Sequence, residues 1–145
     1  MGVTLRIDYE GGLRCRAVHG PSGAQLRTDA PVDNHGRGES FSPTDLVATA
    51  LGACMLTILG IVAERHGLDL RGASATVEKH MAADPERRIG ALPVRIRVPL
   101  DLPEEQRRLL ERAAAACPVC RSLAPGVERP VEFVWGAPDP AGAAS

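Results

Sequence analysis

The sequence has few aromatic residues and no excess of charge of either sign. Phe, Tyr and Trp make up 3% of its 145 residues, and 17 Lys and Arg stand against 18 Asp and Glu. Proteins that bind single-stranded nucleic acid use aromatic stacking surfaces, and binding to nucleic acid or anionic membranes uses a basic field. We therefore expect neither nucleic acid nor a membrane as a partner.

The first ten residues, MGVTLRIDYE, lack the basic and apolar regions of a secretory signal peptide. We expect a cytoplasmic protein, in which thiols stay reduced. A chain of this length buries enough surface to fold without disulfides or a structural metal. Its four cysteines are therefore free to act in catalysis, to bind metal or to pack as inert side chains.

Residues 46–63 carry no formal charge, and their length is at the lower limit of a membrane span. The segment contains Gly52, Gly60 and several alanines, and it lacks aromatic belts and flanking basic clusters. These features favour a helix buried on nearly all sides. A domain this small hardly covers such a helix alone, so we expect a second subunit to cover it.

The local patterns predict a mixed α and β chain. A helix over residues 43–66 has Ser42 as N-cap, Pro43 in its first turn and Asp45 as the acid of a capping box. A second helix opens at Pro103, and a short one restarts near Cys117. Alternating apolar residues predict strands over residues 3–9, 13–19, 24–28, 72–81, 92–100 and 131–135. The order predicts an α+β fold with an antiparallel sheet, a single domain over residues 1–136 and a flexible tail over residues 137–145.

Two cysteines are predicted to face the interior from different helices. Cys54 lies midway along the long helix, and Cys117 lies on one stripe with Leu109 and Ala113. A buried cysteine is most often an inert core residue. Two inward thiols could nevertheless approach each other, and a helix N-terminus beginning with Pro118 stabilises a thiolate. The pattern outlines a dithiol site.

Cys117 and Cys120 also form a C-x-x-C pair, which opens two other interpretations. A thioredoxin-like motif follows a strand, whereas this one follows a helix. A structural zinc site needs a second pair of ligands, and Cys15 and Cys54 stand apart from each other. We expect Cys120 to be half-exposed and Cys15 to lie in the core.

Three segments taken together resemble one protein family. They are Ser42-Pro43-Thr44-Asp45-Leu46, Ala50-Leu51-Gly52-Ala53-Cys54 and Ala116-Cys117-Pro118-Val119. In this order and at these separations they resemble the OsmC/Ohr family of thiol-dependent hydroperoxide reductases. The resemblance runs from about residue 3 to residue 135. It implies an intertwined homodimer with a curved antiparallel sheet, two central helices and an active site at the subunit interface.

By this resemblance Cys54 matches the peroxidatic cysteine and Cys117 the resolving cysteine. The implied substrate is an organic hydroperoxide, the implied reductant is an external dithiol, and no cofactor is implied. Characterised members carry a glutamate ten residues before the peroxidatic cysteine, which helps to orient an arginine on the thiolate. Thr44 occupies that position here, and the neighbouring Asp45 is expected to cap the helix.

The implied arginine would come from the N-terminal hairpin, where Arg14 and Arg16 share a strand face, and the choice between them stays open. Two alternatives to a peroxidase also remain. Without the glutamate, the chain could be a non-catalytic dimer that binds a small apolar or thiol-reactive ligand. The CPVC segment could instead carry out disulfide exchange or bind metal. Under the peroxidase hypothesis Cys120→Ser is expected to be tolerated.

Overall fold

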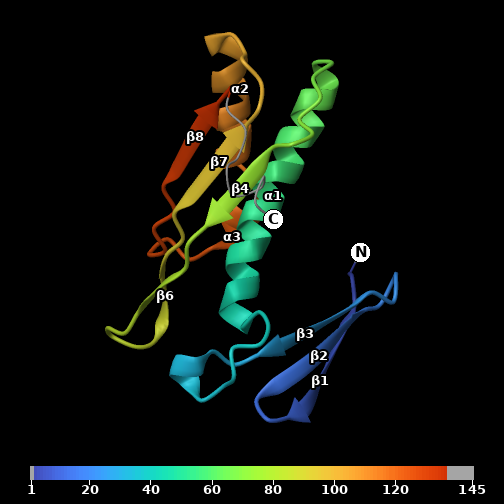
Figure 1. The fold of residues 1–145 in the computed structure, drawn as a ribbon, viewed down its shortest axis with the longest axis vertical. Helices are drawn as coiled ribbons and strands as arrows, with labels where there is room; N and C mark the ends of the chain where they lie inside the picture. The colour runs from blue at the N-terminus through green and yellow to red at the C-terminus, as the bar shows by residue number, and fades with distance from the viewer. Residues whose placement is uncertain (1, 137–145) are drawn as a thin grey trace. The chain divides into compact units, whose positions relative to one another are not determined.

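The computed structural model describes residues 2–136 and divides them into two compact units (Figure 1). One unit runs to Val47, and the other begins at Ala48. The boundary falls in the first turns of the long helix, so each unit contains part of that element. The expected tail over residues 137–145 lies outside the described residues.

The N-terminal unit contains an antiparallel sheet of three strands in the order β1-β2-β3. The strands are β1 (Leu5–Gly11), β2 (Arg14–His19) and β3 (Gln25–Asp29). Gly11 and Gly12 have positive φ values, which glycine adopts at little cost, and they turn the chain between β1 and β2. The expected hairpin is therefore confirmed. Several large apolar side chains of this unit are exposed, among them Leu5, Ile7 and Tyr9.

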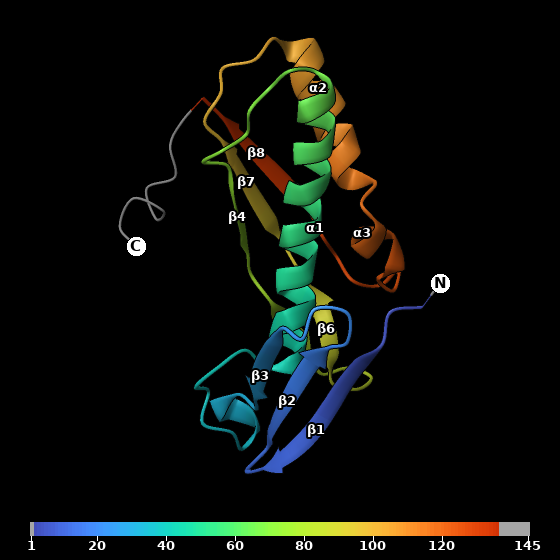
Figure 2. The ribbon, with the colours of Figure 1, turned by 90° about the vertical axis from the view of Figure 1, so that its right-hand side faces the viewer.

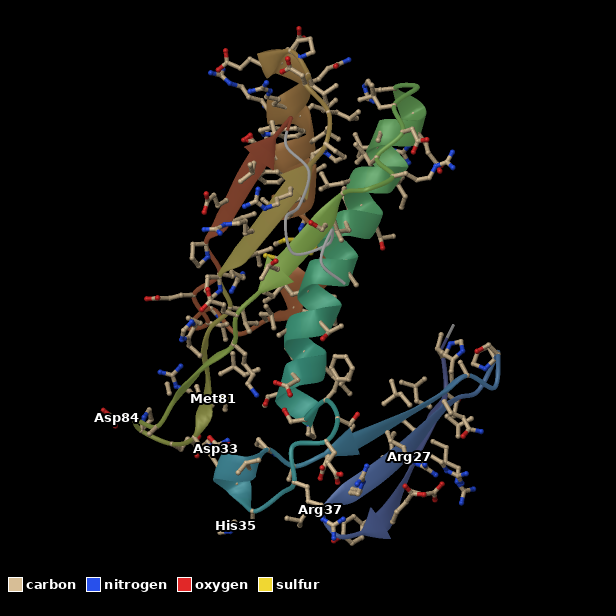
Figure 3. The ribbon with its side chains drawn as sticks, viewed as in Figure 1. Arg27, Asp33, His35, Arg37, Met81 and Asp84 are labelled. Carbon is tan, nitrogen blue, oxygen red and sulfur yellow. The ribbon has the colours of Figure 1, made fainter. Side chains whose placement is uncertain are left out.

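Residues 30–41 form a loop that closes on the end of β3. It contains the 3-10 helix η1 (Val32–Asn34). The Asp29 side chain is fully buried, and its Oδ2 accepts a hydrogen bond of 3.0 Å from the backbone N–H of Glu39. The Asp29 N–H donates to the Phe41 carbonyl at 3.0 Å, so one residue fixes both ends of the loop. Figure 3 shows His35 and Arg37 in this loop, and both are exposed or partly exposed.

The long helix α1 (Pro43–Arg65) begins with the expected capping box. The Asp45 N–H donates to Ser42 Oγ at 3.1 Å, and the Ser42 N–H donates to Asp45 Oδ2 at 2.9 Å. At the other end, the Leu68 N–H donates to the Ala63 carbonyl while Gly67 adopts φ +69°. This is the glycine-dependent arrangement that ends many helices.

Within the chain, α1 buries one stripe of side chains and leaves its other faces open. Its most apolar window has a mean hydropathy of 2.3, and 33% of that window is buried. By length and composition this helix could cross a membrane, a test that core helices also pass. The expected burial on nearly all sides is therefore not reached within one chain. The buried residues are Ala48, Leu51, Gly52, Met55, Leu59 and Ala63.

The second unit contains two sheets. A three-stranded sheet has the order β4-β7-β8, and a separate pair joins β5 to β6. The strands are β4 (Ser74–Val77), β5 (His80–Ala82), β6 (Arg88–Ala91), β7 (Val94–Val98) and β8 (Val131–Trp135). The two long strands expected over residues 72–81 and 92–100 do pair as a hairpin. The first is divided into β4 and β5, and an additional strand, β6, precedes the second, so that β4 pairs with β7 and β5 pairs with β6.

One strand pair departs from the expected antiparallel arrangement. β8 runs parallel to β7, with Val94 opposite Val131 and Val98 opposite Trp135. Parallel neighbours need a long crossover, and here the chain between them forms α2 (Glu104–Ala115) and α3 (Pro118–Ser122). The α+β class is nonetheless as expected.

Helices α1 and α2 lie on the same side of the β4-β7-β8 sheet (Figure 2). Leu110 and Ala114 of α2 are fully buried, so the inward stripe is offset by one residue from the expected Leu109 and Ala113. The Arg107 guanidinium lies 5.9 Å from the ring centre of Trp135 on β8, which ties α2 to the sheet.

Candidate functional site

Two of the predicted thiols meet in the second unit. Cys54 lies half-buried on α1, and Cys117 is fully buried as the N-cap of α3. Their side chains are in hydrogen-bonding contact, and this contact contributes to the raised pKa of Cys117. The structure thus brings the two cysteines together, although Cys117 is placed by the start of α3 and not by the predicted stripe of Leu109 and Ala113.

Gly52 determines how α1 presents Cys54. A Cβ on Gly52 would lie 3.0 Å from Val77 Cγ2 and 3.6 Å from Ala75 Cβ, so α1 rests closely on β4 at this point. Two residues along an α-helix turn it by about 200°, which directs Cys54 away from β4. Figure 2 shows β4 and α3 on opposite sides of α1. The close contact on one side therefore aims the thiol at α3 on the other.

The pKa of Cys117 is raised above the ordinary thiol value, chiefly because burial disfavours the thiolate. The backbone N–H of Cys120, 3.3 Å from Cys117 Sγ, acts in the opposite direction because it donates a hydrogen bond to the sulfur. Contact with Cys54 raises the pKa further. Burial prevails, so Cys117 rests as a neutral thiol.

Cys120 is the third thiol of the cluster, and it differs from the expected half-exposed residue. Its side chain is buried, because α3 turns it toward Arg129 and away from solvent. Arg129 Nε donates to Cys120 Sγ at 3.1 Å. An N–H donor on a guanidinium stabilises negative charge on a sulfur. Among residues 2–136, no carboxylate forms an ion pair with Arg129.

Arg129 is held in place by the sheet and by the loop that precedes it. Its Nη1 donates to the carbonyls of Val127 at 2.8 Å and Ala124 at 3.4 Å. The residues on either side of it are hydrogen-bonded to the β6–β7 segment, since the Leu92 N–H donates to Glu128 and the Val94 N–H donates to Pro130. Sequence reasoning missed Arg129, because no motif connects it with Cys120 and only the parallel β7–β8 pairing brings it there.

The other predicted site residues lie in the N-terminal unit. Arg14 Nη1 forms an ion pair of 3.0 Å with Glu39 Oε1. Arg16 Nε is buried and has no hydrogen-bond partner among the described residues. Thr44 Oγ1 lies 3.2 Å from Ser42 Oγ, and Asp45 accepts the capping hydrogen bond. The interpretation of Asp45 as a capping acid is thus confirmed, and the two arginines differ in their pairing.

Cys15 lies outside the thiol cluster. It sits half-buried on β2 opposite Thr28, and so it is less deeply placed than the expected core residue. The part of the chain that the structure describes contains no group of three or more His, Cys, Asp and Glu side chains arranged to hold a metal ion.

Comparison with known proteins relates the chain to one family. The profile described as "OsmC-like protein" matches residues 36–131. The crystal structure of a candidate osmotic stress induced and detoxification response protein from Psychrobacter arcticus 273-4 is 42% identical to the chain, with a TM-score of 0.88. That alignment covers 92% of this chain and 98% of the other.

Two further structures share the fold at low identity. An organic hydroperoxide resistance protein OsmC from Legionella pneumophila is 19% identical with a TM-score of 0.74, and the alignment covers 92% of this chain and 96% of the other. The organic hydroperoxide resistance protein OhrB of Bacillus subtilis is 18% identical with a TM-score of 0.64, with coverages of 92% and 98%. No curated protein matched the chain.

Proposed function

Because the chain belongs to the OsmC-like protein family, we propose that it is a thiol-dependent peroxidase that reduces organic hydroperoxides through Cys54 and Cys117. The family includes hydroperoxide resistance proteins of the same fold. The observation that carries the proposal is the contact between a half-buried thiol on α1 and a buried, protonated thiol at the start of α3. One thiol is open to a substrate, and the other is positioned to resolve the product.

The reaction begins at Cys54. Its thiolate attacks the distal oxygen of the hydroperoxide, the O–O bond breaks, and the alkoxide leaves with the electron pair and takes up a proton to become an alcohol. Cys54 is left as a sulfenic acid. In this step the sulfur is oxidised and the peroxide is reduced.

Cys117 then attacks the sulfenic sulfur. The S–O bond breaks, hydroxide leaves with the Cys117 proton as water, and a Cys54–Cys117 disulfide forms. The raised pKa of Cys117 suits this step, because the resolving thiol keeps its proton until it is used. An external dithiol reduces the disulfide by two exchange steps and restores both thiols.

The surroundings of the thiols favour an alkyl hydroperoxide over hydrogen peroxide. Met55 directly follows Cys54 and Leu51 lies three residues before it, and both are fully buried. An alkyl group that enters apolar surroundings gains about 0.8 kcal/mol for each CH₂ buried. Hydrogen peroxide has no group that gains in this way.

An arginine from β2 is proposed to stabilise the Cys54 thiolate, and Arg16 is the better candidate. Arg14 is already paired with Glu39, whereas Arg16 has a buried Nε without a partner in the described chain. The peroxidase is further proposed to act in the cytoplasm as a homodimer. Four free thiols suit a reducing compartment, and a second copy would cover the open faces of α1.

The decisive experiment measures consumption of cumene hydroperoxide in the presence of dithiothreitol, together with mass spectrometry of the oxidised protein. Cys54→Ser is expected to abolish consumption, and wild type given one equivalent of hydroperoxide is expected to show a Cys54–Cys117 disulfide. Cys15→Ser is the matched control, since it removes a thiol outside the cluster, and it should keep full activity. Full activity in Cys54→Ser would disprove the proposal.

A further inference from the structure

The third thiol of the cluster has surroundings that the peroxidase reaction does not use. Cys120 is buried, its backbone N–H reaches Cys117 Sγ at 3.3 Å, and its own sulfur accepts a hydrogen bond of 3.1 Å from Arg129. The Arg129 side chain is anchored on two backbone carbonyls and has no carboxylate partner among the described residues. A half-buried guanidinium paired with a buried sulfur calls for an explanation beyond packing.

We infer that Cys120 is a second resolving thiol, which receives the disulfide from Cys54 and frees that residue for another turnover. The inference rests on the proposed peroxidase function, because the Cys54–Cys117 disulfide is its starting point. Arg129 acts as a positioning residue that holds the Cys120 sulfur next to Cys117 and donates a hydrogen bond to it. The result is a protein that stores one disulfide in the CPVC segment while Cys54 is again a thiol.

The exchange step balances without a further oxidant or reductant. The Cys120 thiolate attacks Cys117 Sγ and forms the Cys117–Cys120 bond as the Cys54–Cys117 bond breaks. The electron pair goes to Cys54 Sγ, which leaves as a thiolate, the form that reacts with the next hydroperoxide. Any proton on Cys120 is released to solvent before the attack.

The local geometry of α3 supports the attack on Cys117 in particular. Cys117 is the N-cap and Cys120 is the third residue of the helix, so their side chains leave the same turn. The hydrogen bond from the Cys120 N–H to Cys117 Sγ keeps that sulfur against the Cys120 backbone. Among the described residues, the titratable groups hydrogen-bonded to Cys120 are Arg129 and Cys117.

The test follows both disulfides over time after one equivalent of cumene hydroperoxide and an alkylating quench. Trypsin leaves Cys117 and Cys120 in one peptide, residues 113–121, and Cys54 in another. We expect the link between the two peptides to rise first and then fall as the bond within residues 113–121 forms. In Cys120→Ser the first link should persist, and in Cys54→Ser hydroperoxide should produce neither bond.

Arg129 is tested by the rate of the exchange and its dependence on pH. Arg129→Gln should slow formation of the second disulfide about tenfold near neutral pH and move the pH dependence of the rate upward, whereas Arg129→Lys should recover part of the rate. Arg108→Gln, which removes an exposed guanidinium paired with Glu104, is the control and should change neither. An unchanged pH profile of the exchange rate in Arg129→Gln would show that Arg129 does not assist the exchange.

A second oxidant separates this inference from the peroxidase proposal. Diamide oxidises thiols without a peroxide, so it can form the first disulfide even if the protein is no peroxidase. If diamide yields a Cys117–Cys120 bond that depends on Cys54 and hydroperoxide yields no disulfide, the exchange stands and the peroxidase proposal fails. If hydroperoxide yields a Cys54–Cys117 bond that persists in wild type at all times, the peroxidase proposal stands and the exchange is disproved.

Discussion

At the scale of single residues, burial gives Cys117 and Cys54 different chemical characters. The two thiols are in contact, yet Cys117 has no exposed surface, whereas Cys54 is half-buried. The pKa of Cys117 is raised mainly by this burial. A thiol that resists ionisation is a poor first nucleophile, because the thiolate is the reacting form, so the division of labour between the two follows from their depth.

The raised pKa of Cys117 makes protein stability depend on alkaline pH. In the unfolded chain this thiol ionises near pH 8.5, whereas in the folded chain it keeps its proton to higher pH. The folded state therefore binds more protons in that interval, and the free energy of unfolding falls as pH rises above about 8.5. Urea unfolding from pH 7 to pH 10 under reducing conditions should show this fall. Cys117→Ala should show a smaller one, and an equal slope in both proteins would contradict the prediction.

The two arginines of β2 are expected to differ in their effect on turnover. Arg16→Gln should lower kcat/KM for cumene hydroperoxide by about 10- to 100-fold, because a hydrogen bond to a charged group contributes about 1.5–3 kcal/mol. Arg14→Gln is the matched variant on the same strand face, and its guanidinium is already paired with Glu39. Steady-state kinetics of both variants make the comparison. A larger loss of kcat/KM in Arg14→Gln than in Arg16→Gln would instead assign the stabilisation of the Cys54 thiolate to Arg14.

Residues that belong to local patterns were predictable from the sequence, and residues that depend on strand pairing were not. Ser42 and Asp45 cap α1 as expected, because a capping box needs only residues three positions apart. Cys54 and Cys117 were identified by helical spacing and family motifs. Arg129 has no local signature, and the burial of Cys120 depends on the same distant contacts.

At the scale of elements, the packing of α1 on β4 controls where Cys54 lies. Gly52 allows this approach, since any Cβ there would meet Val77 and Ala75. Gly52→Val is expected to reduce the free energy of unfolding by about 1–3 kcal/mol through overpacking, and to weaken the Cys54–Cys117 contact as α1 moves away. Urea unfolding followed by the fluorescence of Trp135, the single tryptophan, gives the first value, and the yield of Cys54–Cys117 disulfide gives the second.

Gly60 provides the matched control on the same helix. Nothing lies within 4 Å of a Cβ placed there, so Gly60→Ala should raise stability by up to about 1 kcal/mol through helix propensity. A fall in stability instead would show that a second molecule contacts the helix at this position.

The alternation of apolar residues along the chain predicts where strands lie but not how they pair. Alternation located the segments that form β4, β5 and β7, but it missed β6 and the break between β4 and β5. The predicted antiparallel sheet was wrong for β8, because the same run of apolar residues fits a parallel or an antiparallel neighbour. The crossover through α2 and α3 decides the direction, and that is a property of the chain beyond any single strand.

At the scale of the whole molecule, each of the two units leaves large apolar side chains exposed. Ile7 is 60% exposed on β1, and Ile61 is 43% exposed on α1. A monomer rarely presents a long apolar helix to water. We propose that a second copy covers these residues, as the resemblance to the family implies.

Sedimentation at micromolar concentration is expected to show a homodimer. Ile61→Asp should shift the distribution toward monomer, because a carboxylate in an apolar interface loses its hydration. Glu105→Lys, on an exposed position of α2, serves as the control for a change of charge and should leave the dimer intact. A folded wild-type monomer at this concentration would contradict the prediction.

The parallel pairing of β7 and β8 also sets the order in which the thiol cluster matures during folding. The contact between Cys120 and Arg129 spans few residues, but Arg129 is fixed through Glu128 and Pro130 to Leu92 and Val94, more than thirty residues earlier in the chain. Such distant contacts form late, because the entropy cost of closing a long loop comes before the contacts contribute any stabilising free energy. Before β8 has docked, a nascent chain therefore exposes a CPVC segment that lacks the hydrogen bond from Arg129 to Cys120. The thiol cluster gains this hydrogen bond only when the last strand is in place.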